Sequence, residues 1–304
     1  MNGGGGRDYG ASSPSYSVAH SLEMTRQRDG EAELAQVFAD TLKDINQFDS
    51  EASQQHRDTA CDALGTEFDV YDIHGGGSRT RHTYVNGLSD VDLLLDLGSY
   101  SASTLPDKDN PAAILSAMEA RIRRRLPGTE VQAGRMAVTV RFSDGHELQI
   151  LPAFRYHSGY RVPDPQGGGW TVTGPRRFAA LLSARNGEVG GKLLRTIKLG
   201  KLICGKAGVE IKSYHLENIA LQAFERYTGP RSDQAMLGHL FNFAKTRVMR
   251  PMRDITGQET HVDRYLADAG ARTALARRLA TIERSISAAG DRATPWRAIL
   301  GGDI

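Results

Sequence analysis

The chain has 304 residues, with 38 Lys and Arg against 36 Asp and Glu, a net charge of +2 and two cysteines. This length leaves room for one large or two modest domains with a buried core. Two distant cysteines exclude a disulfide framework and a cysteine-rich zinc site, and the small net charge argues against a uniformly basic nucleic-acid-binding surface. Apolar runs are too short to span a bilayer, so we expect a cytoplasmic protein that does not enter a membrane.

The N-terminal region changes character near Glu31. Residues 1–30 begin with MNGGGG and hold few apolar side chains, so we expect a disordered tail there. From Glu31 onwards, apolar residues such as Leu34 and Phe38 recur at three- and four-residue steps. This spacing predicts a long amphipathic helix with a break near Asp49.

A strand, a helix and a hairpin are predicted in the middle of the first half. Residues 68–73 form a short strand that ends in glycines, and 91–97 form a nearly continuous apolar strand that we expect to be central and buried. A helix covers 115–126 and stops at Pro127. The alternating segments 136–142 and 147–153 flank a Ser-Asp-Gly turn and predict a hairpin.

The second half is predicted to be mostly helical. A Gly- and Pro-rich segment, 158–175, is expected to be the joint between the halves, and Gly301 with Gly302 to lie in a flexible tail. The apolar periodicity places helices near 176–185, 190–206, 213–228, 232–249 and 262–288.

The segment most suggestive of chemistry begins with Gly77 and Ser78. Glycine lets a backbone approach a ligand closely, and free N–H groups at a helix start favour phosphate. Asp90 and Asp92 follow on the predicted central strand, where alternate residues point to one side about 6–7 Å apart. Such a pair can bind hard divalent cations. Taken alone, the Gly-Ser pair could be a simple turn and the Asp-x-Asp pair a solvated strand end. The two pairs occur together, the first after a strand and the second inside an apolar strand, and this combination favours a nucleotide site. Asp96 lies about 13 Å beyond Asp92 and is assigned to structure or solvent.

Residues 78–93 resemble the Gly-Ser and Asp-x-Asp signature of polymerase-β-like nucleotidyltransferases, and Thr83 and Ser89 narrow the resemblance to the bacterial cyclic-oligonucleotide synthases, the CD-NTases. The segments 151–154 (LPAF), 192–201 (KLLRTIKLGK) and 212–217 (KSYHLE) resemble later blocks of that family. The resemblance implies an α+β fold in which a nucleotidyltransferase core, with a mixed sheet and a long spine helix, packs on a C-terminal helical domain. The implied parts are a tail over 1–30, the core over 31–160 and the helical domain over 161–304.

The resemblance also implies roles for individual residues. Gly77 and Ser78 would hold the donor phosphates, and Asp90 and Asp92 would bind two Mg²⁺ ions, or Mn²⁺, that align the triphosphate. Lys198 would touch the triphosphate. Ser213 would hydrogen-bond to it, and Tyr214 would stack on a base.

The residues themselves support these last roles less strongly. Arg195, Lys198 and Lys201 form a basic stripe that could be an ordinary solvated helix face. Ser213 could be a helix N-cap and Tyr214 a core aromatic. With the resemblance included, the preferred interpretation is ligand contact for Lys198, Ser213 and Tyr214.

Gln149 departs from the family pattern, which has a third carboxylate at this position. That acid would bind a metal at the acceptor hydroxyl and take up its proton, whereas an amide oxygen can ligate Mg²⁺ but is not a base. Three readings stay open. Gln149 ligates the metal in an active enzyme, Glu147 is re-aimed through a bulge to replace it, or catalysis is impaired.

The function implied is a template-independent nucleotidyltransferase that joins NTPs, ATP among them, releases pyrophosphate and makes a cyclic di- or oligonucleotide messenger for anti-phage defence of the CBASS type. Its partners would be NTPs, an effector reached through the product and a regulatory protein. Activation by double-stranded DNA is not expected, because the sequence has no His/Cys cluster with zinc-ligand spacing. The alternatives are a catalytically impaired nucleotide-binding sensor and an RNA-end nucleotidyltransferase using the Arg-rich segments 121–125 and 247–253.

Overall fold

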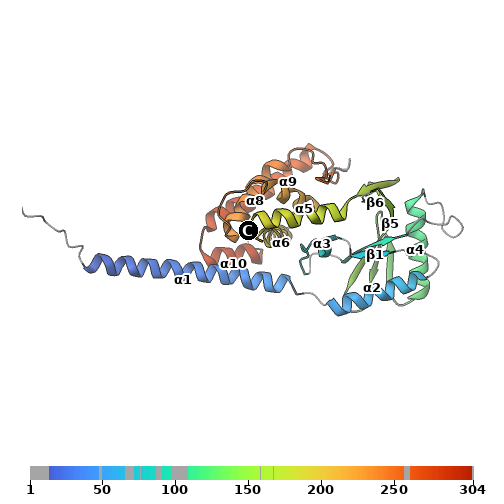
Figure 1. Ribbon diagram of the computed structural model, residues 1–304, viewed down its shortest axis with the longest axis horizontal. Coiled ribbons are helices and arrows are strands. Elements are labelled where there is room, and N and C mark those ends of the chain that lie inside the picture. The colour runs from blue at the N-terminus through green and yellow to red at the C-terminus, as the bar shows by residue number, and fades with distance from the viewer. Residues whose placement is uncertain are drawn as a thin grey trace, which may run out of the picture.

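The structure is a computed structural model that describes residues 14–47, 50–65, 72–75, 77–86, 91–97, 109–157, 159–166, 168–256 and 261–302. It is elongated, with a sheet-containing lobe at one end and a helical lobe beside it (Figure 1). None of the described helices is long and apolar enough to cross a membrane. The helices are α1 (Pro14–Ile45), α2 (Ser50–Leu64), α3 (Gly77–Thr80), α4 (Pro111–Arg125), α5 (Pro175–Glu188), α6 (Leu193–Lys206), α7 (Ser213–Ala223), α8 (Asp233–Arg247), α9 (Ala269–Ala289) and α10 (Ala293–Gly301).

The sheet has the mixed topology expected of the fold. Its main order is β1-β2-β5-β4-β3, in which β2 and β5 run parallel and the other pairs are antiparallel. The strands are β1 (Asp72–Gly75), β2 (Val91–Asp96), β3 (Glu130–Ala133), β4 (Val138–Arg141), β5 (Glu147–Tyr156), β6 (Gly159–Pro163) and β7 (Trp170–Thr173). The predicted central strand, hairpin and helix 115–126 are therefore confirmed, while residues 68–71 of the first predicted strand lie outside the described part of the chain.

Two hydrophobic cores hold the lobes. One joins α2 and α4 to the sheet through fully buried residues such as Leu64, Leu95 and Ile122. The other unites α1 with α5–α10, and in it Phe38 meets Trp296 edge to face at 4.9 Å. The predicted break near Asp49 is confirmed, because α1 ends at Ile45 and α2 begins at Ser50. Each of these two helices therefore packs in a different lobe.

Three expectations about irregular segments are wrong. The predicted disorder of 1–30 fails from Pro14, because α1 begins there and its exposed N-terminal turns project past the helical lobe (Figure 1). Leu, Glu, Met and Gln are good helix formers, and the packed part of α1 lets the helix propagate outwards. The joint at 158–175 instead contains β6 and β7, which extend the sheet from β5. Gly301 ends α10 and Gly302 caps it at φ 110°, because Trp296 anchors this helix in the core.

Candidate functional site

The turn that starts at Gly77 is held against the central sheet. Gly77 has a φ of 60°, a left-handed conformation that glycine adopts without steric cost, and it opens the short helix α3, which packs on β2. Ser78 is 5% exposed, and its carbonyl accepts a 2.8 Å hydrogen bond from the backbone N–H of Thr83. The predicted phosphate turn is thus part of a short loop that the hydrogen bond between Ser78 and Thr83 closes.

The strand register brings two predicted site residues together. β2 and β5 are parallel neighbours, and Asp92 lies in register with Gln149. Neighbouring strands are about 4.8 Å apart, so the backbone places position 149 beside position 92. This is where the family pattern has its third carboxylate. Asp90 lies outside the described residues, and Asp92 is described through its backbone alone.

Glu147 is engaged elsewhere. It lies opposite Arg141 on β4, and its carboxylate accepts a 2.7 Å hydrogen bond from Arg141 Nε. Arg141 also binds Glu130 on β3 at 2.6 Å, which completes a row of charges across the hairpin. This arrangement counts against the reading in which Glu147 replaces the missing acid, because re-aiming it would break the row.

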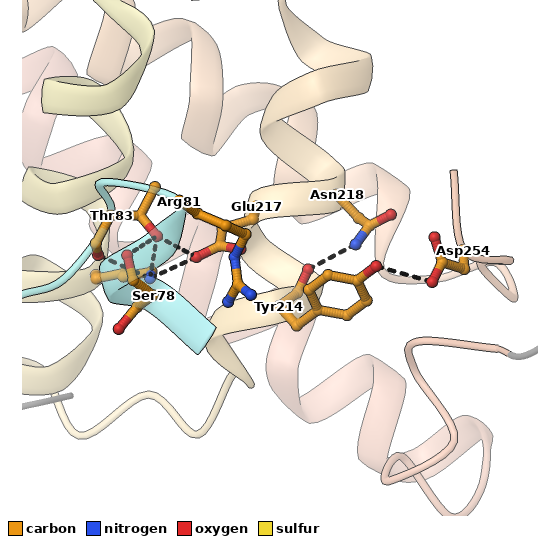
Figure 2. A network of polar contacts seen from close by, with 8 residues as sticks. Ser78, Arg81, Thr83, Tyr214, Glu217, Asn218 and Asp254 are labelled. Carbon is orange, nitrogen blue, oxygen red and sulfur yellow. Dashed lines mark hydrogen bonds and ion pairs between the residues drawn. The ribbon is translucent and has the colours of Figure 1, made fainter. Parts of the chain in front are cut away.

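A buried charge network ties the Gly77–Ser78 loop to the helical lobe (Figure 2). Glu217 on α7 is completely buried, and it accepts hydrogen bonds from Arg81 Nε at 2.6 Å, Thr83 Oγ1 at 2.5 Å and Lys201 Nζ at 2.7 Å. Lys201 also donates to the backbone carbonyl of Thr83 at 2.9 Å. Burial alone would raise the pKa of Glu217, but the positive charges of Arg81 and Lys201 hold it below its ordinary value. Glu217 is therefore a carboxylate that links two lobes.

Sequence reasoning gave Arg81 and Glu217 no role and placed Lys201 on a basic stripe that could be a solvated helix face. The signal that could have identified Glu217 is a lone carboxylate in the apolar run of α7, LENIAL. A charge in such a position is buried only when it has partners. Two of those partners, Thr83 and Arg81, lie 134 and 136 positions before Glu217 in the chain, and periodicity does not reveal contacts over such a separation.

The basic stripe on α6 is divided among separate contacts. Arg195 forms an ion pair with Asp233 on α8, and Lys201 points into the buried network. Lys198 Nζ donates a 2.6 Å hydrogen bond to Asn46 Oδ1 at the end of α1, and partial burial lowers its pKa. The stripe is thus not an uninterrupted solvated face, because Arg195 and Lys201 each pair with a carboxylate and Lys198 bonds to the amide of Asn46.

Ser213 and Tyr214 start α7, and Lys212 holds the N-cap position without a side-chain cap. Ser213 is therefore not the N-cap. It is exposed and lines a cavity of about 110 Å³ with Lys201 and Leu216. Tyr214 packs on Phe178 with ring centroids 4.6 Å apart, and its hydroxyl donates to Asp254 at 2.8 Å (Figure 2). Burial, followed by the nearby Asp254 charge, raises the pKa of Tyr214. These contacts agree with the core alternative for Tyr214.

Asp96 has a structural role, the first of the two alternatives predicted for it. It is fully buried on β2 and accepts a 2.6 Å hydrogen bond from Arg155 Nε on β5. This ion pair lies at the far end of the β2–β5 pair from Asp92 and Gln149. It therefore anchors the two strands that carry the candidate site without belonging to it.

Comparison with known proteins places this architecture. The family model of the Second Messenger Oligonucleotide or Dinucleotide Synthetase (SMODS) domain matches residues 33–186. The structure of CdnC from E. coli MS115-1, solved with ATP, superposes with a TM-score of 0.69 at 16% identity, covering 88% of this chain and 97% of that one. The Bradyrhizobium diazoefficiens CD-NTase CdnG, in complex with GTP, gives 0.69 at 17% identity, covering 88% and 95%. E. coli DncV, with bound 3′-deoxy GTP, gives 0.58 at 13% identity, covering 90% and 85%.

Comparison with curated protein sequences gives no match. The structural likenesses establish the fold, which is the polymerase-β-like fold of the CD-NTases, as the resemblance implied. The family model spans more than half of the chain and includes the Gly77 turn, β2 and β5. The chain therefore belongs to the family of the Second Messenger Oligonucleotide or Dinucleotide Synthetase (SMODS) domain and has the fold of the CD-NTases.

Proposed function

We propose that the protein joins NTPs, releases pyrophosphate and closes the product into a cyclic di- or oligonucleotide, with a role in CBASS anti-phage defence. The observation that supports this most is the alignment of Asp92 with Gln149 on parallel strands beside the turn at Gly77. The family assignment and the ATP and GTP bound to CdnC and CdnG point to the same substrate class.

The proposed site suits magnesium. Carboxylate and amide oxygens are donors that Mg²⁺ accepts, and Asp90, Asp92 and Gln149 would provide them. Two bound ions would neutralise the triphosphate and the developing charge on the departing pyrophosphate. Gly77 and Ser78 would bind the donor phosphates through the closed loop described above. Lys198 would add a positive charge, and Ser213 a hydroxyl, from the helical lobe.

The chain would act mainly by orientation. The ribose hydroxyl of one nucleotide must lie in line with the α-phosphate of another, and holding two reactants in place can supply much of the rate. The Glu217 network fixes the phosphate loop against α6 and α7, so the two lobes present their groups in one geometry. Gln149 can orient the acceptor side, but it cannot take the proton, which must pass to water or to the nucleotide itself.

Replacing Asp92 with Asn should abolish most activity. Loss of this charge removes a proposed metal ligand, so we expect pyrophosphate release to fall on the order of 10³-fold. The measurement is the initial rate of pyrophosphate release from a mixture of four NTPs with Mg²⁺. Asp62→Asn, which removes an exposed carboxylate from α2, is the matched control and should leave the rate unchanged. Comparable activity in Asp92→Asn would refute the proposed metal site.

The product distinguishes cyclisation from RNA-end addition. We expect labelled NTPs without RNA to give a phosphatase-resistant product, with no further incorporation when RNA is added. In the described structure, Arg247 bonds to Gln222 and to the carbonyls of Arg250 and Pro251, so part of the Arg-rich segment is used internally. Chromatography and mass spectrometry of the product provide the test. Label that appears solely in RNA would establish the alternative, and tight NTP binding without pyrophosphate would establish the sensor.

A further inference from the structure

Three side chains outside the nucleotide site converge on one point. His56 belongs to α2, while Asp144 and His146 belong to the turn between β4 and β5. Their ligand atoms all lie within 4.8 Å of one another. Asp144 Oδ2 is 2.6 Å from His56 Nε2 and 3.3 Å from His146 Nδ1. We propose that these residues form a zinc site that joins α2 to the start of β5.

The donor set fits this ion. Zinc binds histidine nitrogen and carboxylate oxygen, and three protein ligands leave the fourth tetrahedral position to water. With bond lengths near 2.0–2.1 Å, adjacent donors of a tetrahedron lie about 3.3 Å apart. The Asp144–His146 separation of 3.3 Å already has this value. The Asp144–His56 separation must open from 2.6 Å, a shift within the reach of two side chains.

The ligands are held in place before any ion binds. Phe142 stacks on His56 with ring centroids 3.9 Å apart and planes 23° apart. The other oxygen of Asp144, Oδ1, accepts a 3.1 Å hydrogen bond from the backbone N–H of His146. Gly145, at φ 88°, allows the turn that brings these two residues to the same side. Contacts of this kind orient metal ligands and contribute to affinity.

A simple ion pair between His56 and Asp144 leaves one observation unexplained. Nδ1 of His146 is buried and makes no hydrogen bond of good geometry among the described residues, although Asp144 Oδ2 lies 3.3 Å from it. Buried polar atoms are almost always partnered, and a metal ion between the three side chains would satisfy this nitrogen.

The position of the site gives it a structural consequence. His146 directly precedes β5, the strand that aligns Gln149 with Asp92. An ion between the turn and α2 would fasten the end of the hairpin to the helix that covers the same sheet. This inference does not rest on the proposed function, because a zinc site here would exist whatever the nucleotide site does.

Zinc binding to the full-length chain tests the site directly. Protein freed of metal with EDTA and then dialysed should bind one Zn²⁺ per chain in calorimetric titration with zinc chloride. His146→Gln and Asp144→Asn should each weaken binding by about 100-fold or more, because each removes a ligand. His20→Gln, on the exposed part of α1, is the matched control and should bind as the parent chain does. His146→Gln should unfold at the parent temperature in EDTA, and zinc should raise the unfolding temperature of the parent and control but of neither turn variant.

Cobalt provides a second measurement. Co²⁺ in a four-coordinate site gives an intense visible absorption band, which we expect in the parent chain and in His20→Gln but not in His146→Gln. The proposal fails if the parent chain binds no zinc at micromolar concentration, or if His146→Gln retains the parent affinity and the cobalt band. Either result would leave His56 and Asp144 as an ion pair that merely fixes the turn.

Discussion

Replacing Gln149 with Asp should raise the rate of pyrophosphate release on the order of 10²-fold. The substitution places a carboxylate in register with Asp92, where the present side chain offers an uncharged amide. A carboxylate can ligate the acceptor-side metal with charge and can accept the proton of the attacking hydroxyl. We expect the gain mainly in kcat, because proton removal belongs to the chemical step, and a lower Mg²⁺ concentration for half-maximal rate.

Two features separate this explanation from a general improvement in folding. The kcat of Gln149→Asp should acquire an acid limb, falling as pH drops through the pKa of the new carboxyl, and the parent enzyme should lack that limb. Glu147→Gln, which removes the carboxylate bonded to Arg141, is the control and should leave kcat unchanged. An unchanged or lower kcat in a folded Gln149→Asp protein would show that proton removal at this position does not limit the rate. Activity that is detectable in Gln149→Asp but not in the parent chain would support the hypothesis that catalysis is impaired in the natural sequence.

The elements predicted correctly are those with a local signal. β2 follows from an unbroken apolar run, α4 from its periodicity and the stop at Pro127, and the hairpin from alternation around a turn. The juxtaposition of positions 92 and 149 was accessible too, but through the family pattern and not through spacing. Parallel strands joined by a long connection acquire their register from tertiary packing, which a single sequence does not encode locally.

The elements that were missed depend on contacts far away in the chain. The outer half of α1 looked disordered by composition, yet it continues a helix whose inner half is packed around Phe38. The strands β6 and β7 are stabilised as extensions of β5, although their own sequence is rich in Gly and Pro. The same limitation applies to the buried network, because Arg81 and Glu217 are unremarkable charges until the two lobes are assembled.

Glu217→Ala should be the most destabilising substitution around the site. It would leave the buried ammonium of Lys201 and the partly buried guanidinium of Arg81 without their carboxylate, and breaking a buried pair costs about 3–5 kcal/mol of unfolding free energy. Chemical denaturation provides the measurement. Glu225→Ala, which removes an exposed carboxylate just beyond α7, should change stability by less than about 0.5 kcal/mol. A similarly small loss of stability in Glu217→Ala would show that the buried charge network does not stabilise the fold.

The dependence on pH and on a second substitution identifies the charge as the cause. Because the pKa of Glu217 is held below its ordinary value in the folded state, its stabilisation is complete above the unfolded pKa of about 4.3 and is lost as pH falls through the folded pKa. The stability difference between the parent and Glu217→Gln should therefore shrink below that range. Adding Lys201→Met to Glu217→Gln should cost less than the sum of the single losses, since the second change removes a cation that the first left unpaired. In every variant that remains folded, the KM for NTP should rise more than kcat falls, because the buried charge network orients the phosphate loop and takes no part in bond making.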